Sequence, residues 1–314
     1  MNRWLIALAV FAACAEKAEA PPALPDAGVV TATATAVREP SPAEKLEQEG
    51  LRYVQVVIKS NLESSLAPVA EPELAAALAQ VVNRTLVWWA DPATDLRTGD
   101  IVEAVYRPRP GEEPEALAVW FKSLKHGKAF SAVRYQAEGG AYARWYTPDG
   151  EELELRLVEG PIQDYEQVTS LVGDGRRHKG VDFKAAQGTP VTSPFDGIVE
   201  RKNWAMRGNG MSVDIHLAKG GVNAYFLHLS EISPKVKVGA RVRKGEVIGK
   251  SGNTGRSTAP HLHYQLVRGK KVLDPFRYHQ THRAKLAEGE IPRLAAAEAR
   301  LSVLRKPHDA ARDL

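Results

Sequence analysis

The chain has 314 residues, which is long enough for two folded domains with additional tails. Apolar residues make up 44% of it and charged residues 25%, as in ordinary folded soluble proteins. The formal net charge is +4, which is too small to indicate a nucleic-acid-binding face. We therefore predict no nucleic-acid partner.

The first residues have the pattern of an export signal. Arg3 supplies a positive start, and residues 4–13 form an apolar run that is too short to cross a bilayer as a helix. Residues 11–14 resemble a lipoprotein box ending in Cys14, whereas Ala18-Glu-Ala20 resembles an ordinary cleavage site. We favour the lipoprotein reading, with a signal peptide over 1–14 (or 1–20) and acylated Cys14 as a possible lipid anchor. Because Cys14 is the only cysteine, an intramolecular disulfide is excluded.

Two segments of different character follow the signal. Residues 15–44 are rich in Ala, Pro, Thr and Val and are predicted to be a disordered, semi-rigid linker. Residues 45–165 are predicted to be a small non-catalytic α+β module, with a helix from Glu73 to Val87 and β-rich runs at 101–106, 116–121, 129–135 and 141–146. Its Trp and Tyr residues are expected in the core, with a sugar-binding face as the alternative.

The remainder is predicted to be mainly β. Residues 166–279 contain short strand-like runs with Gly, Pro and Asp turns, which indicate an antiparallel domain. The runs lie at 180–183, 197–200, 211–216, 223–228, 246–249 and 261–266. Residues 280–314 are predicted to be a helical tail, with one amphipathic surface helix over 284–304.

Histidines and one aspartate in this β region have the composition of a catalytic metal site. His261 and His263 are two residues apart, so a strand would place both side chains on one face. We predict His178, Asp182 and His263 as ligands of Zn²⁺, because two imidazoles and one carboxylate leave a fourth position open. His228 and His261 are predicted to carry out proton transfer.

The order and spacing of these residues resemble those of the M23 metallopeptidases, the lysostaphin-type peptidoglycan endopeptidases. The resemblance covers residues 178–275, and its most specific runs are His178-Lys-Gly-Val-Asp-Phe183, Leu227-His-Leu-Ser230, Ser251-Gly-Asn-Thr-Gly-Arg-Ser-Thr258 and Pro260-His-Leu-His-Tyr264. Phe226 stands where the family usually has tyrosine, and Ala259 where glycine is common.

The resemblance implies an antiparallel β-sheet peptidase domain with a groove over one zinc ion per chain. It implies the same ligands (His178, Asp182, His263) and the same catalytic histidines (His228, His261). The module at 45–165 resembles those that precede this domain in Gram-negative envelope endopeptidases. The implied function is hydrolysis of the D-Ala–diaminopimelate cross-link, with peptidoglycan peptide stems as partners. The implied location is the periplasmic side of the cell envelope. Separately, the lipoprotein box, followed by Ala15 and not by an inner-membrane retention signal, predicts a lipid anchor in the outer membrane.

Two other functions remain open from the sequence. One is an envelope scaffold or amidase activator that uses the groove for binding alone. The other is an M23 peptidase of different specificity, such as a Gly-Gly endopeptidase. A complete set of five site residues argues for an enzyme, but groove specificity depends on loop shape, which residue patterns do not show.

Overall fold

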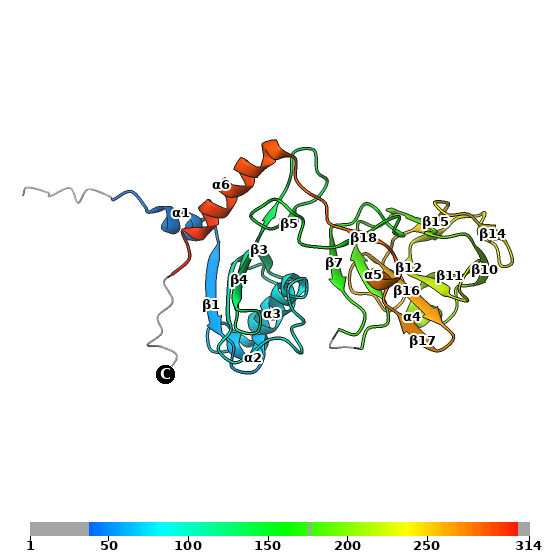
Figure 1. Cartoon of the computed structure of the whole chain (residues 1–314), viewed down its shortest axis with the longest axis horizontal. Coiled ribbons are helices and arrows are strands. Elements are labelled where there is room, and N and C mark those ends of the chain that lie inside the picture. Colours follow the sequence, from blue (N-terminus) through cyan, green and yellow to red (C-terminus); the bar gives the residue numbers. More distant parts are fainter. Residues whose placement is uncertain (1–37, 175–176, 307–314) are drawn as a thin grey trace, which may run out of the picture. The chain divides into compact units, whose positions relative to one another are not determined.

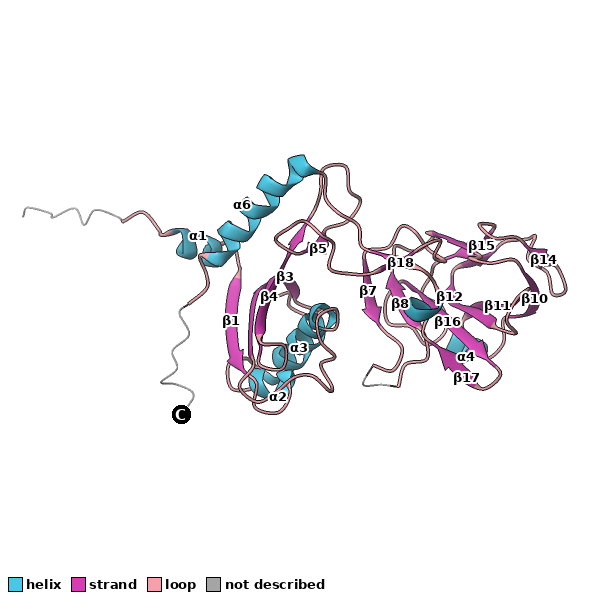
Figure 2. Ribbon diagram, in the orientation of Figure 1, coloured by secondary structure: helices cyan, strands magenta, loops and turns pink. Residues whose placement is uncertain are grey.

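The computed structural model describes residues 38–174 and 177–306 (Figure 1). Cys14, the predicted signal peptide and the predicted linker up to residue 37 lie outside the described residues. Antiparallel strands predominate, as Figure 2 shows, so the predicted mainly β fold is confirmed. In the part of the chain that is described, no helix has the length and apolar character needed to cross a membrane.

A five-stranded antiparallel sheet with strand order β1-β2-β3-β4-β5 organises the first module. The predicted helix is present as α3, which begins at Pro72 and ends at Leu86. The elements are α1 (Pro42–Gln48), β1 (Arg52–Val57), α2 (Leu62–Leu66), α3 (Pro72–Leu86), β2 (Ile101–Arg107), β3 (Glu115–Ser123), β4 (Lys128–Tyr135), β5 (Arg144–Tyr146) and β6 (Arg156–Leu157). Helix α1 therefore begins within the last residues of the predicted linker.

Both faces of this sheet are buried, which explains the unbroken apolar run from Ala116 to Phe121 in β3. Val119 and Phe121 pack in one cluster with Leu78 of α3. Ala118 and Trp120, on the other face, belong to a second cluster. Successive side chains of a strand point to opposite faces, so a sheet covered on both sides needs a continuous apolar run.

The aromatic residues of the first module are largely part of these cores. Trp120, Trp145, Tyr106 and Tyr146 are each no more than 7% exposed. Such burial leaves none of the four available to stack on a sugar ring, so the structure favours their role in the core.

The C-terminal segment completes the second of these clusters. It contains β18 (Thr281–His282), a 3-10 turn η1 (Glu288–Glu290) and α6 (Ile291–Ser302). Strand β18 pairs with β6, and α6 contributes buried Leu294 and Leu301 to the cluster around Trp120. Each buried leucine stabilises the fold by roughly 2 kcal/mol. The amphipathic pattern thus reflects packing on the sheet, and the helix is shorter than the predicted 284–304.

An eight-stranded antiparallel sheet and a three-stranded sheet build the second module. The large sheet has the order β14-β10-β11-β12-β16-β8-β7, with β17 paired to β16, and the small one has the order β13-β15-β9. All six predicted strand-like runs form strands. The elements are β7 (Gln167–Ser170), β8 (Val181–Lys184), β9 (Pro190–Thr192), β10 (Gly197–Lys202), α4 (Met206–Asn209), β11 (Met211–Leu217), β12 (Asn223–Leu229), β13 (Glu231–Ile232), β14 (Arg241–Val242), β15 (Val247–Lys250), β16 (His261–Arg268), β17 (Lys271–Leu273) and α5 (Pro275–Tyr278).

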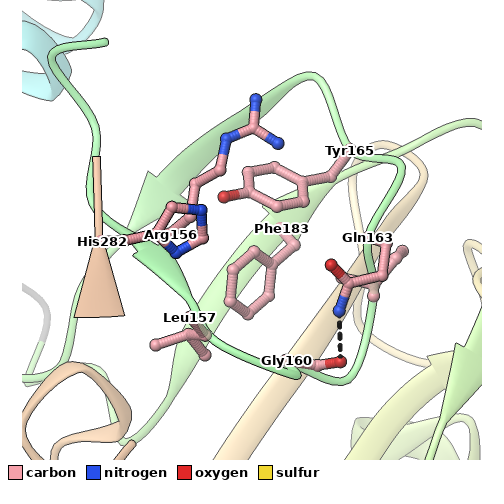
Figure 3. Close-up of a pocket in the computed structure, with 8 residues that line it drawn as sticks. Arg156, Leu157, Gly160, Gln163, Tyr165, Phe183 and His282 are labelled. Carbon is pink, nitrogen blue, oxygen red and sulfur yellow. Dashed lines mark hydrogen bonds between the residues drawn. The ribbon is translucent and has the colours of Figure 1, made fainter. Parts of the chain in front are cut away.

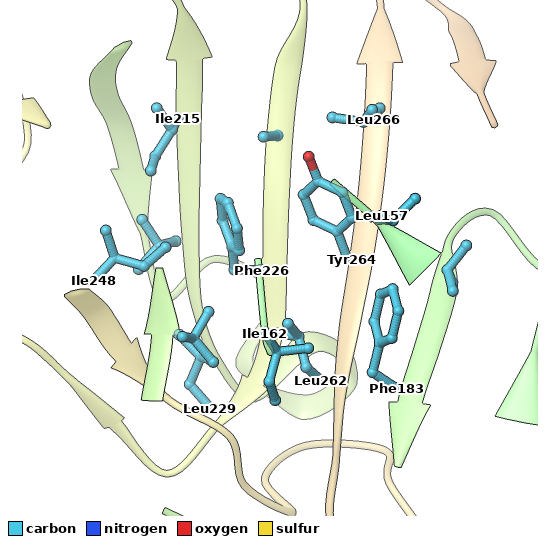
Figure 4. Packing of buried hydrophobic residues seen from close by; sticks show 14 of the residues in the cluster. Leu157, Ile162, Phe183, Ile215, Phe226, Leu229, Ile248, Leu262, Tyr264 and Leu266 are labelled. Atoms are coloured by element: carbon cyan, nitrogen blue, oxygen red, sulfur yellow. The ribbon is translucent and has the colours of Figure 1, made fainter. Parts of the chain in front are cut away.

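One face of the large sheet forms the core of this module. Phe183, Phe226 and Tyr264 come from neighbouring strands and are at most 1% exposed (Figure 4). Val191 of β9 and Ile248 of β15 join the same cluster from the small sheet. Because side chains alternate along a strand, the residues next to these point to the opposite face, and those residues include Asp182 and His263.

Candidate metal and catalytic site

Three predicted ligand atoms lie together on the outer face of the large sheet. Asp182 of β8 and His263 of β16 are directly paired in register. Asp182 Oδ1 lies 2.8 Å from His263 Nδ1, and His178 Nε2 lies 3.2 Å from that carboxylate oxygen and 3.0 Å from His263 Nδ1. They form the one group of this kind found among the described residues that can hold a metal ion.

Gly180, inside the run from His178 to Asp182, leaves room for the His263 ring. A Cβ at Gly180 would lie 2.6 Å from His263 Nε2 and 2.6 Å from the Tyr264 carbonyl oxygen. Real Cβ atoms do not approach other atoms so closely. Glycine at this position is therefore a steric requirement of the ligand set.

The hydrogen bonds of His178 define which ring nitrogen faces the other ligands. Nδ1 lies 3.3 Å from the Leu171 carbonyl oxygen and 2.9 Å from Ser170 Oγ, which in turn is hydrogen-bonded to Asp174. A carbonyl oxygen only accepts, so Nδ1 carries the proton and the Nε2 lone pair points to Asp182 and His263. Neither Ser170 nor Asp174 was predicted as a site residue.

The electrostatics of the ligand group suit a bound cation. Burial would raise the pKa of Asp182, but the adjoining imidazoles of His178 and His263 outweigh it and hold the pKa well below its usual value. Burial lowers the pKa of His178, but the Asp182 carboxylate outweighs this and the net shift is upward. The carboxylate is therefore ionised and able to bind a metal ion at neutral pH.

The other two predicted site histidines lie beside the ligands. The rings of His228 and His261 are 4.7 Å apart between centroids, and His261 Nε2 is 3.8 Å from Asp182 Oδ1. His228 Nδ1 donates to the Thr254 carbonyl oxygen at 2.8 Å, and His261 Nδ1 donates to that of Ala259 at 2.8 Å. Both rings therefore keep a proton on Nδ1 and leave Nε2 as an acceptor.

His228 departs from regular strand geometry. Its φ is 62°, in the left-handed region that residues other than glycine rarely adopt. The glycine-rich run packs closely here, since a Cβ at Gly252 would lie 2.3 Å from the Ser230 nitrogen and 2.8 Å from the His228 carbonyl oxygen. Burial, with the nearby imidazoles, lowers the pKa of His228 to about 4, so this ring is neutral at pH 7.

Comparison with known proteins places this arrangement in a family. Residues 176–275 match the sequence profile described as peptidase family M23. The five predicted site residues, His178, Asp182, His228, His261 and His263, lie within the match. Residues 176–275 therefore form a domain of peptidase family M23.

Relatives in this family include two curated bacterial proteins. The peptidoglycan DD-endopeptidase ShyC of Vibrio cholerae is 30% identical over 194 residues, which are 57% of this chain and 42% of ShyC. An uncharacterized metalloprotease of Haemophilus influenzae is 39% identical over 150 residues, which are 45% of this chain and 31% of that protein. The chain thus spans less than half the length of these relatives.

Among solved structures, the catalytic domain of the antimicrobial peptidase lysostaphin from Staphylococcus simulans is similar to this chain. The match has 34% sequence identity and a TM-score of 0.32, and it covers 40% of this chain and 90% of that domain.

The donor set of this M23 domain fits zinc, the metal of the family. Catalytic zinc sites use three protein ligands, commonly two histidines and one carboxylate, at about 2.0–2.2 Å from the metal. Ligands at that distance in a tetrahedron are separated by roughly 3.3 Å, and the three atoms here are 2.8–3.2 Å apart. The residues present therefore suit one zinc ion with an open fourth position.

Two further features lie away from this site. His279 is partly buried and hydrogen-bonded to the Tyr264 hydroxyl, and burial lowers its pKa to about 4. A cavity of about 90 Å³ is lined by Arg156, Tyr165 and Phe183 among others (Figure 3). Phe183 is on the opposite face of β8 from Asp182, so this cavity is not the metal site.

Proposed function

We propose that this protein is a zinc-dependent endopeptidase that hydrolyses peptide cross-links of peptidoglycan. The observation that carries the proposal is that three ligand atoms lie together, with the rings of His228 and His261 beside them and their Nε2 atoms left as acceptors. The groups form a metal centre with a base and a second proton donor or acceptor beside it, which is what hydrolysis of an amide requires.

Each residue has a defined part in the proposed reaction. His178, Asp182 and His263 hold the zinc ion, which when bound polarises the scissile carbonyl and acidifies the attacking water. One of His228 and His261 accepts the proton of that water at Nε2. That proton then passes from the imidazolium to the leaving amine. The other ring stabilises the oxygen anion of the tetrahedral intermediate when that ring is protonated at Nε2 as well as at Nδ1.

The proposed bond is the D-Ala–diaminopimelate cross-link. The alignment with the DD-endopeptidase ShyC spans 194 residues, whereas the M23 profile matches residues 176–275 alone. The similarity to ShyC therefore extends beyond the peptidase domain. This favours a DD-endopeptidase over a Gly-Gly endopeptidase. It also favours a peptidoglycan peptide stem as the binding partner of this protein.

We also propose that the protein acts on the periplasmic side of the cell envelope. A lipid on Cys14 would anchor it, with outer-membrane attachment as the expected location, and the Ala/Pro-rich linker would let the catalytic domain reach the wall. A Cys14→Ser variant is expected to appear in the soluble periplasmic fraction. Membrane retention of that variant, or failure of the wild-type protein to incorporate labelled fatty acid, would contradict the anchor.

The endopeptidase is tested by digestion of cross-linked diaminopimelate-type peptidoglycan. Zinc-loaded protein from residue 21 onward should convert dimeric muropeptides to monomers, read by mass spectrometry, and His263→Ala or a chelator should abolish this. Failure to cut although zinc is bound would reject the enzyme on this substrate and favour a binding scaffold or another specificity.

A further inference from the structure

A second row of polar and aromatic side chains lies next to the metal ligands on the same face. Gln265 follows His263 by two residues on β16 and therefore shares its face, and its side-chain oxygen lies 3.4 Å from His263 Nε2. In register, Gln265 is paired with Tyr225 of β12, Tyr225 with Asp214 of β11, and Asp214 with Arg201 of β10. The row thus crosses four strands. It starts at Gln265, two residues along β16 from the proposed ligand His263.

Arg201 is held in a fixed position at the end of this row. Its Nε donates to Asp214 Oδ2 at 2.7 Å, and Asp214 is 1% exposed. The guanidinium carbon lies 4.3 Å from the ring centroid of Trp204 and 5.3 Å from that of Tyr225. We call Arg201, Trp204, Tyr225 and Asp214 the Arg201 platform. Because the ion pair and two rings fix the guanidinium, it is preorganised for a ligand.

The outer side of the guanidinium is available to a ligand. The Arg201 side chain is 45% exposed, although its ion-pair partner is buried. Arginine carries five N–H donors in a planar fork, so the bond from Nε to Asp214 and the hydrogen bond to Tyr225 still leave Nη donors for a second carboxylate. The half-buried Trp204 and Tyr225 rings offer an adjoining apolar surface.

We propose that the Arg201 platform is a substrate subsite that binds a free carboxylate of the peptide stem. The proposal rests on the proposed function and names the part of the substrate that this subsite binds. A diaminopimelate residue has two carboxyl groups, of which the main-chain amide of its stem uses one. The free carboxylate would pair with the Arg201 Nη groups, and the methylene carbons leading to it would contact Trp204.

The distances suit a carboxylate several bonds away from the scissile amide. Strands of a sheet are about 4.8 Å apart, so β10 lies roughly 14 Å from β16. The Arg201 side chain leans back over Tyr225, which places the guanidinium on the order of 10 Å from His263. In the stem that supplies the D-Ala carbonyl, the free carboxylate of diaminopimelate lies at a similar distance from the scissile bond. This distance is about the length of three residues of extended chain.

The test is a comparison of matched substrates on matched variants. Cross-linked stem dimers would be prepared with the free carboxylate of the carbonyl-side diaminopimelate either unmodified or amidated. For the wild-type protein, amidation is expected to raise KM about 10-fold with kcat little changed, as expected for loss of one charge-assisted pair. Arg201→Gln should lose the discrimination and bind both substrates like the amidated one. Arg268→Gln, an exposed arginine at the far end of β16, is the control.

A second measurement separates binding from folding. Because Arg201→Gln leaves the buried Asp214 without its cation, Arg201→Gln with Asp214→Asn keeps the pair neutral, and Arg201→Lys keeps the charge. Arg201→Gln, the double variant and Arg201→Lys should each bind the uncleaved stem monomer more weakly than wild type when all are metal-free. Arg201→Lys should be the least affected. Equal KM for both substrates with wild-type protein, or discrimination retained in Arg201→Gln, would overturn the subsite while leaving the endopeptidase intact. Cleavage of neither dimer by the wild-type protein would overturn both proposals.

Discussion

Removal of the Ser170 hydroxyl is the most direct test of how the metal site is oriented. Ser170 Oγ accepts from His178 Nδ1 at 2.9 Å and is hydrogen-bonded on its other side to Asp174. This places a hydroxyl and a carboxylate behind an imidazole that we propose as a metal ligand. Such outer hydrogen bonds fix the ring orientation and raise the basicity of the ligand. Ser170→Ala is therefore expected to weaken zinc binding without touching any ligand.

The size of the effect follows from what remains after the substitution. Loss of an outer hydrogen bond typically lowers metal affinity by about 10- to 100-fold. In this protein the Leu171 carbonyl oxygen still accepts from His178 Nδ1 at 3.3 Å, so the tautomer is retained. We therefore expect the lower end of the range, about 10-fold, or roughly 1.4 kcal/mol. Asp174→Asn, which keeps a hydrogen-bond acceptor but removes the charge, should have a smaller effect.

The assay is competition for zinc against a chromophoric chelator, with thermal unfolding of the metal-free protein as a check on folding. Ser257→Ala is the matched control, because Ser257 Oγ lies 3.2 Å from Nδ1 of His261, which is not a proposed ligand. Its zinc affinity should equal that of the wild-type protein. The reasoning is refuted if Ser170→Ala binds zinc within twofold of wild type, or if Ser257→Ala loses as much affinity.

Three further predictions concern residues in and behind the site. Gly180→Ala should lower zinc affinity in the same competition assay, because its Cβ would collide with His263; unchanged affinity would mean that the ring moves freely. His228→Ala and His261→Ala should each lose at least about 100-fold in kcat but keep zinc, whereas His263→Ala should lose zinc. Burial raises the pKa of Glu154 from 4.5 to about 8, so the folded form keeps a proton that the unfolded chain releases. Its contribution to stability is complete below pH 4.5 and is lost as the pH rises through 8, by up to ~5 kcal/mol; Glu154→Gln should flatten this slope in urea melts, and an equal slope would contradict it.

Much of the second module was predictable because its strands are short, regular and separated by turn residues. All six predicted runs are strands. In the first module, β1 (Arg52–Val57) was not predicted. It lies at the edge of the sheet and pairs with β2 alone. Residues 53–58 (Tyr-Val-Gln-Val-Val-Ile) are mostly aromatic or β-branched, which is a local strand signal that the prediction missed. The pairing with β2, more than 40 residues away in sequence, has no local signal.

The tail illustrates a different limit. The spacing of Leu294 and Leu301 indicates an amphipathic helix but not the surface that its apolar side covers. That surface includes Ala118 and Trp120 of β3, far away in sequence. A helical period identifies a buried face, whereas the partner of that face is set by the topology of the whole chain.

Site residues divide in the same way. Side chains that belong to a recognisable run, such as His178 and Asp182, were predictable from that run. Ser170 and Gln265 were not, because a serine before a turn or a glutamine in a strand is common and has no metal-site pattern. Their positions become informative only when the register of β8 with β16 and β7 is known.

The backbone also accounts for part of the chemistry that side-chain patterns suggest. Three imidazoles of the site donate from Nδ1 to backbone carbonyl oxygens, those of Leu171, Thr254 and Ala259. Carbonyl oxygens cannot titrate, so the tautomers that expose Nε2 do not depend on pH or on neighbouring side chains. The glycines of the run from Ser251 to Thr258 are then explained without any contact to substrate. Gly252 lets the loop that carries the Thr254 carbonyl lie against the end of β12, where His228 adopts its left-handed conformation. A substitution in this loop should therefore act on the orientation of His228, and hence on kcat, before it acts on zinc binding.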